Sequence, residues 1–289
     1  MADLSEEQIA GLLEKGDVPK ILDVLAGGNV TYNRLAQERL LSAVEQSATA
    51  ADVPKILDAL AGGNVTAELA QERLSFAVAN NATAADIPKI LDAMASGKVP
   101  IWGAQARLSF AVANNATAAD VPKILDVLAG GNVTYNRLAQ ARLSFAVANN
   151  ATAADVPKIL DVLAGGNVTD ELAQERLSFA VEQSATAADV PKILDAMASC
   201  QVTNTSARFH LSEVVERLID PENPEHQTAF RNALPALKEM SAIRERVARL
   251  EERMQSTTAP SRKFTNGSAQ PVATRTNGTT GAPRRQITN

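Results

Sequence analysis

The stretch ATAADVPKILDVLAGGNVT occurs twice in this chain, at residues 116–134 and again at residues 151–169. Its Val/Ile-Pro-Lys-Ile core marks six related units, which begin at Val18, Val53, Ile87, Val121, Val156 and Val190. Successive units are 34 or 35 residues apart. A period of this length predicts an array of identical supersecondary units.

Each unit predicts two helices. In the second unit, the apolar residues of the first helix follow the spacing of one buried stripe: Val53, Ile56, Leu57 and Leu60. Thr49 and Asp52 have the spacing of a capping box, and the alternative is that Asp52 itself is the N-cap. A Gly-Gly pair ends this helix. The segment ELAQERLSFAVAN (68–80) predicts the second helix.

A single helical hairpin cannot bury its apolar stripe, whereas stacked hairpins can. We therefore predict an all-α fold, an α-solenoid of six stacked hairpins over residues 17–220. Residues 1–16 predict an N-terminal capping helix, in which Ser5 and Gln8 form a capping box. The apolar content comes mainly from Ala, Leu and Val, since aromatic residues make up only 3% of the chain.

The string VPKILDVLAGG, followed by a second helix with an L-A-x-x-R-L core, resembles HEAT and armadillo repeats. This resemblance implies an α-solenoid that acts as a binding scaffold and carries no chemistry of its own.

The 34-residue hairpins with a Gly-Gly turn are also similar to TAL-effector DNA-binding repeats. Those repeats read one base each through a variable residue pair before the glycines. Here that pair is nearly constant, as in Leu60-Ala61, Leu128-Ala129 and Leu163-Ala164. Residues 52–81 of the second unit contain four acids against two bases, whereas duplex binding depends on Lys and Arg. Nucleic acid is therefore a disfavoured partner, and a TAL-like binder is kept as the second alternative.

After a Pro-rich break, residues 227–255 predict one long helix that forms a coiled coil. Its a and d positions are Ala236, Met240, Ile243, Val247, Leu250 and Met254. The hexapeptide RVARLE (246–251) resembles a motif of short parallel trimeric coiled coils, which implies that Arg246 meets Glu251 of a neighbouring chain. We predict a homo-oligomer, with a trimer favoured over a dimer. The alternative is an amphipathic helix that packs back on the solenoid.

Residues 256–289 form a low-complexity basic tail with no acid, in a chain of net charge −5. We predict an extended segment that binds a protein assembly through Arg262, Lys263, Phe264, Arg275, Arg284 and Arg285. Trp102, the single tryptophan, is a further candidate contact, with local packing as the alternative.

Motifs for catalysis, metal ligands or cofactor binding are absent from the sequence, so we predict no enzyme and no cofactor. No apolar run approaches 18 residues, so no membrane partner is predicted. The function predicted from these signals is a structural interaction protein, specifically a trimeric virion component such as a capsid decoration or fibre-like protein. An intracellular HEAT-like adaptor in the cytoplasm is the first alternative.

Overall fold

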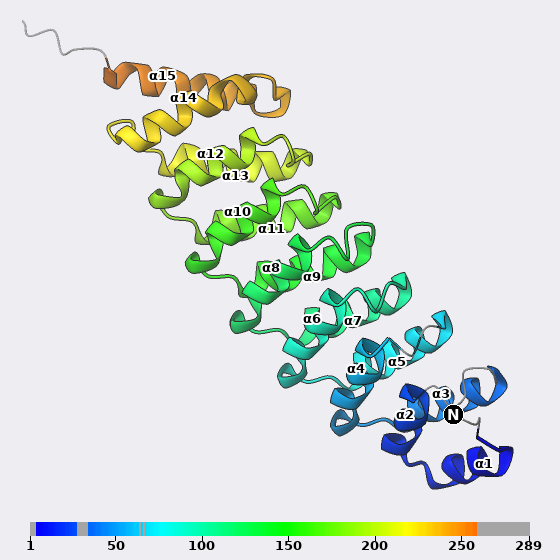
Figure 1. The fold of residues 1–289 in the computed structure, drawn as a ribbon. Coiled ribbons are helices and arrows are strands. Elements are labelled where there is room, and N and C mark those ends of the chain that lie inside the picture. The colour runs from blue at the N-terminus through cyan, green and yellow to red at the C-terminus, as the bar shows by residue number, and fades with distance from the viewer. Residues whose placement is uncertain (1–3, 28–33, 64, 66, 259–289) are drawn as a thin grey trace, which may run out of the picture.

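The computed structural model describes residues 4–27, 34–63, 65 and 67–258. This part of the chain contains fifteen α-helices and six short 3-10 helices and no strand, which confirms the all-α solenoid. The helices stack in two parallel rows along one elongated body (Figure 1). Helix α1 (Glu6–Lys15) lies at one end and packs against the second helix of the first hairpin.

Six hairpins follow α1, and each contributes one helix to each row. The first helices are α2 (Val18–Ala26), α4 (Val53–Ala61), α6 (Ile87–Ala95), α8 (Val121–Ala129), α10 (Val156–Ala164) and α12 (Val190–Ala198). The second helices are α3 (Arg34–Ser47), α5 (Glu68–Asn81), α7 (Trp102–Asn115), α9 (Arg137–Asn150), α11 (Glu171–Ser184) and α13 (Thr205–Leu218). Every helix contacts its counterparts in the neighbouring repeats, as a solenoid requires.

A Thr–Asp pair fixes the start of α4, α6, α8, α10 and α12, whereas α2 begins with Asp17 alone as its N-cap. Before α8, the backbone N–H and the hydroxyl of Thr117 both donate to Asp120 Oδ2 at 2.8 Å. This box closes a 3-10 turn over Ala118–Asp120, and Asp120 stands at the N-cap position of α8 without a side-chain hydrogen bond to that helix. The same holds for Thr49 and Asp52, so the structure shows the capping box and not the alternative. Pro122 follows in the first turn, where a missing N–H costs least.

The core lies between the two rows of helices. In the central repeat, Ile124, Leu125 and Leu128 of α8 are fully buried, as are Leu143 and Val147 of α9. Burial of such a side chain contributes about 1.5–3 kcal/mol relative to the exposed state. Because the same positions are buried in repeat after repeat, this term grows with the length of the array.

A buried glutamine in most second helices joins one repeat to the next. Gln140 is fully buried, and its Nε2 donates to the backbone carbonyls of Thr134 at 3.0 Å and of Asn167 in the next repeat at 2.8 Å. Its Oε1 accepts from the N–H groups of Thr169 and Asp170. These bonds satisfy polar groups of two consecutive loops at once, so they fix how one repeat sits on the next.

Ion pairs also join successive first helices, each at 2.7–2.8 Å. They are Lys55–Asp23, Lys89–Asp58, Lys123–Asp92, Lys158–Asp126 and Lys192–Asp161. The aspartates are about two-thirds exposed, as in Asp92 at 67%. Exposed pairs of this kind contribute well under 1 kcal/mol each, so they favour the stacking register more than they add stability.

The single helix expected over residues 227–255 is wrong. The chain forms two helices, α14 (Pro224–Lys238) and α15 (Arg244–Thr258), joined by a turn and a 3-10 segment at Ser241–Ile243. Helix α14 packs beside α12, and α15 lies beside α13 and α14. The pair therefore continues both rows as a seventh hairpin at the end opposite α1 (Figure 1).

Burial within one chain explains this fold. Five of the six residues expected at the coiled-coil seam are at most 7% exposed, while Ala236 is half-buried; the five are Met240, Ile243, Val247, Leu250 and Met254. A coiled coil of about three heptads would bury the same side chains only after association, which costs translational and rotational entropy. Docking on the last repeat of the same chain avoids that cost. The alternative of an amphipathic segment that packs back on the solenoid is what the structure shows.

No helix in the described part of the chain has the length and apolar character needed to cross a membrane.

Candidate interaction surface

The outer side of the second-helix row carries a line of phenylalanine rings. Phe110, Phe145 and Phe179 are 41–43% exposed, and Phe76 is half-buried at the same position of its own repeat. Adjacent packed helices lie about 8–10 Å apart, so the rings repeat at about that interval along the solenoid. We call this side of α3, α5, α7, α9, α11 and α13 the second-helix face.

A cation from the following repeat lies over most of these rings. The guanidinium of Arg107 is 4.6 Å from the centre of the Phe76 ring, and Arg142 and Arg176 are each 5.1 Å from Phe110 and Phe145. The ring of His210 meets the edge of Phe179 at 6.0 Å. Cation–π contacts of this kind stabilise by about 0.5–1 kcal/mol at exposed sites. The rings and cations therefore form one continuous ladder.

Further exposed apolar residues lie at or just before the first turns of the second helices. They are Leu35, Leu69, Trp102, Tyr135, Leu138 and Leu172, with exposed fractions from 39% to 82%. Single exposed apolar residues are ordinary on protein surfaces, whereas a contiguous row of them marks a binding surface. The face thus combines aromatic, aliphatic and arginine side chains, the types enriched in protein interfaces.

The third repeat departs from the others at this face. Its loop reads Lys-Val-Pro-Ile before Trp102, so Pro100 stands where Thr169 stands in a later repeat. Proline has no N–H to donate, and Oε1 of the buried Gln71 has no hydrogen-bond partner among the described residues. An unpaired buried acceptor costs about 1–3 kcal/mol. Such a cost next to an exposed tryptophan points to a local role for this loop.

Charge also varies along the second-helix face. The loops and second helices of the third and fourth repeats, residues 96–115 and 130–150, contain four basic residues and no acid. The flanking segment 62–81 contains Glu68, Glu72 and one arginine, and segment 165–184 contains four acids and one arginine. The centre of the face is therefore positive between two acidic flanks.

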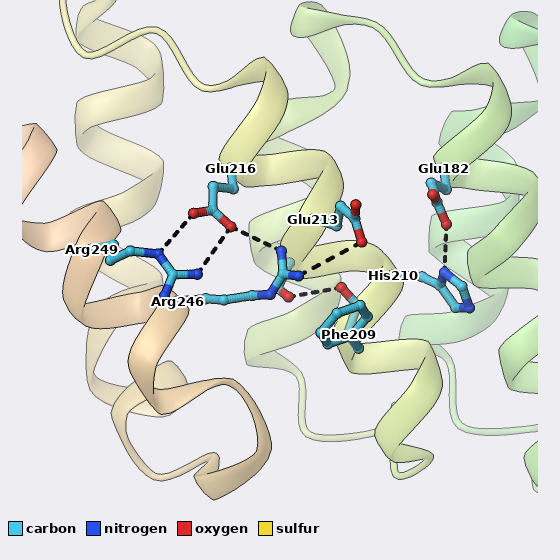
Figure 2. Close-up of polar contacts among 8 residues, drawn as sticks. Glu182, Phe209, His210, Glu213, Glu216, Arg246 and Arg249 are labelled. Atoms are coloured by element: carbon cyan, nitrogen blue, oxygen red, sulfur yellow. Dashed lines mark hydrogen bonds and ion pairs between the residues drawn. The ribbon is translucent and has the colours of Figure 1, made fainter.

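The residues predicted for oligomerisation all lie in the α14–α15 hairpin, where they have partners in their own chain. Arg246 pairs with Glu216 at 2.9 Å and with Glu213 at 3.7 Å, and its guanidinium lies 4.1 Å over the ring of Phe209 (Figure 2). Glu251 pairs with Lys238 of its own chain at 2.9 Å. The oligomeric state itself stays a prediction.

Arg249 adds a second cation to the same cluster. Its Nε donates to Glu216 at 3.0 Å, and Arg249 and Arg246 reach the one carboxylate from α15 (Figure 2). The hydrogen bond from Arg249, followed by the charges of both arginines, lowers the pKa of Glu216 below its ordinary value. The cluster therefore attaches the last hairpin to α13 electrostatically.

Two histidines also lie near this end of the solenoid. His210 Nδ1 lies 2.5 Å from a carboxylate oxygen of Glu182 (Figure 2), and the buried His226 contacts the backbone of Ala187 and Asp220. Both contacts join neighbouring repeats. Within the described residues, no group of three or more His, Cys, Asp or Glu side chains is arranged to hold a metal ion.

The predicted tail contacts lie outside the described residues, whereas Trp102 lies inside them and is 65% exposed. Sequence reasoning missed the phenylalanine row, although a signal was present. In RLSFAV, the leucine, the alanine and the valine fill the buried stripe, so the 3.6-residue period places Phe110 beside that stripe.

Comparisons with protein-family profiles, with curated proteins and with solved structures gave no match to this chain.

Proposed function

We propose that this protein is a non-catalytic scaffold that binds a partner protein along its second-helix face. The observation that carries the proposal is the row of phenylalanines, three of which lie under an arginine from the following repeat. A core of exposed aromatic and aliphatic groups with arginine at its edges matches the composition of protein interfaces.

The solenoid form supports this function. Copies of one hairpin extend the face at a constant interval, so an elongated partner can contact several repeats in turn. The first-helix row is different, because its exposed positions carry Lys–Asp pairs that are already satisfied within the chain. A partner gains less from a surface whose charges are paired than from one with exposed rings.

Site-specific photocrosslinking in the cells that express the protein tests the proposal. A photoreactive residue at Phe110 or Phe145 should crosslink the full chain to a discrete partner. The matched control places the same residue at Asp126 or Asp161 of the first-helix row, which is about two-thirds exposed. Crosslinks that form equally from both rows, only from the first-helix row or from neither contradict the proposal.

The narrower assignments stay predictions. A homotrimeric virion component that is anchored by residues 256–289 remains the specific candidate, and a cytoplasmic HEAT-like adaptor remains its alternative. The intrachain packing of Val247 and Leu250 removes the coiled-coil argument for a trimer. The scaffold proposal does not depend on either assignment.

A further inference from the structure

We propose that the centre of the second-helix face, over α7 and α9, binds an acidic segment of a partner protein that also carries apolar side chains. This inference rests on the proposed function and names the chemistry of the partner. We call the site the central patch and define it by Trp102, Arg107, Tyr135, Arg137, Leu138 and Arg142.

The cations of the central patch lack carboxylate partners. Arg107, Arg137 and Arg142 form no ion pair within the described residues, whereas Arg73 in the flanking repeat pairs with Glu45. Arg73 reaches Glu45 of the preceding helix, at the position where α5 and α7 carry Ala79 and Ala113. Ala106 and Ala141 also stand where the flanking repeats have Glu72 and Glu175.

The structure shows how the unpaired charge is held. The guanidinium of Arg142 lies over the Phe110 ring, and its Nη1 donates to the backbone carbonyl of Ala106. Burial, and the nearby charge of Arg107, lower the pKa of Arg142. Two adjacent cations without an acid favour an incoming carboxylate, which would form charge-assisted hydrogen bonds with them.

The apolar part of the patch is contiguous across the two repeats. Trp102 is 65% exposed, Tyr135 82% and Leu138 51%. Asn136, which follows Tyr135 directly, donates from Nδ2 to the backbone carbonyl of Trp102 at 3.0 Å. This bond fixes the loop that carries Tyr135 against the start of α7. Apolar side chains of the partner segment would pack here, between its acidic residues.

The acidic flanks define the extent of the site. Glu72 reaches the start of α7, since a Cβ on Gly103 would lie 2.0 Å from its Oε1. Glu171 and Glu175 lie on the other side, in a hollow that they line together with Arg137. An acidic segment is repelled by both flanks and attracted by the centre, so charge sets its register on the solenoid.

Other occupants fit less well. The faces of the Phe76, Phe110 and Phe145 rings are covered by guanidinium groups, so nucleic-acid bases cannot stack on them. The basic segment 256–289 of the chain has the same charge as the patch. A second copy that is centred on the same patch would place arginine against arginine.

Selection from a displayed library of random peptides of about 16 residues, long enough to cross both repeats when extended, tests the inference on the full chain. We expect the selected peptides to be enriched in Asp and Glu together with apolar residues. Their affinity, measured by fluorescence polarisation, should fall as salt rises.

The variant Arg107→Glu/Arg142→Glu should weaken these peptides at least tenfold, and the milder Arg107→Gln/Arg142→Gln should weaken them less. The matched control is Arg231→Glu/Arg244→Glu, which changes the net charge equally at two exposed arginines outside the face. This control should change the affinity less than threefold. Circular dichroism of each variant verifies that the fold is retained.

Several outcomes overturn the inference. Among these are selected peptides without acidic enrichment, no selected peptide, equal effects of the two charge reversals, and tighter binding of a single-stranded DNA probe through the same arginines. A dimer in light scattering that the Arg107→Glu/Arg142→Glu variant dissolves also overturns it. Peptides that depend on Phe110 and Leu138 but not on the arginines leave the scaffold proposal intact. If no substitution on the second-helix face changes the affinity of the peptides, both the inference and the scaffold proposal are contradicted.

Discussion

The guanidinium of Arg246 in α15 lies 2.9 Å from the carboxylate of Glu216 in α13, within one chain. Arg249 binds the same carboxylate from one turn further along α15 (Figure 2). The sequence motif that suggested pairing between chains is therefore used to attach the last hairpin to the solenoid. Glu216 is the acceptor on which this attachment depends.

Replacement of Glu216 by Gln should make stability depend less on pH. The pKa of Glu216 in the folded chain lies below its ordinary value of 4.5. Its ionised form therefore stabilises the fold at pH values above the unfolded pKa, and this stabilisation is lost as the pH falls through the folded pKa. Because the side chain is about one-third exposed, we expect a loss of only about 1 kcal/mol at pH 7. Urea denaturation from pH 7 to pH 3 measures it, and a wild-type advantage that persists at pH 3 contradicts the assignment.

Truncation of Val247 to Ala should destabilise the α14–α15 hairpin by about 1–3 kcal/mol, because this side chain is only 3% exposed. Since its contacts lie within one chain, the urea midpoint should be the same at protein concentrations about a hundredfold apart. Arg244→Ala, at an exposed position of the same helix, is the control. A midpoint that rises with concentration would restore the coiled-coil hypothesis.

Two aspartates of one repeat should respond differently to the same substitution. Asp120 is 8% exposed and accepts two hydrogen bonds from Thr117, so Asp120→Ala should cost about 1–2 kcal/mol. Asp126 is 66% exposed and makes only a surface pair with Lys158, so Asp126→Ala should cost less than about 0.5 kcal/mol. Both variants change the charge equally, and denaturation compares them directly. Equal costs would show that the capping box does not fix the start of α8.

Substitution of Pro100 by Thr should stabilise the solenoid by about 1 kcal/mol, since it supplies an N–H near the unpaired Oε1 of Gln71. The reverse change, Thr169→Pro, removes the N–H that donates to Gln140 at 3.0 Å and should destabilise it. Thermal denaturation measures both changes. If Pro100→Thr leaves the stability unchanged or lowers it, the proline before Trp102 does not destabilise the solenoid.

Cys200 has a left-handed backbone, with φ of 61°, at the position where Gly63, Gly131 and Gly166 lie in other repeats. Side chains are strained in this region, so Cys200→Gly should stabilise the chain by about 1 kcal/mol. Cys200→Ala removes the thiol without relieving the strain and should leave stability nearly unchanged. If both variants stabilise equally, the thiol and not the backbone is the cause.

The repeat and its boundaries follow from local chemistry that the sequence shows directly. The apolar stripe from Val53 to Leu60, the Thr49–Asp52 pair and the glycines after the helix each depend on neighbours a few residues away. Six copies of the apolar stripe predict the stacked hairpins, because only stacking buries the stripe.

The phenylalanine row of the second-helix face could have been predicted from the sequence, since the helical period places Phe110 outside the buried stripe. The contacts between arginines and rings could not have been predicted from the sequence, because Arg142 and Phe110 come from different repeats. Their contact depends on how one hairpin sits on the next, and the buried amide of Gln140 helps to set that geometry.

The sequence by itself thus determined the six repeated hairpins and their order, because caps, glycines and the apolar period act over one or two turns. Only the tertiary structure decided what the last segment does. The heptad pattern of Val247, Leu250 and Met254 predicts that one face of the helix is buried, but it does not predict the surface against which that face packs. The last repeat belongs to the same chain, so packing against it costs no translational or rotational entropy of association. The segment therefore folds back at Ser241 and forms the seventh hairpin.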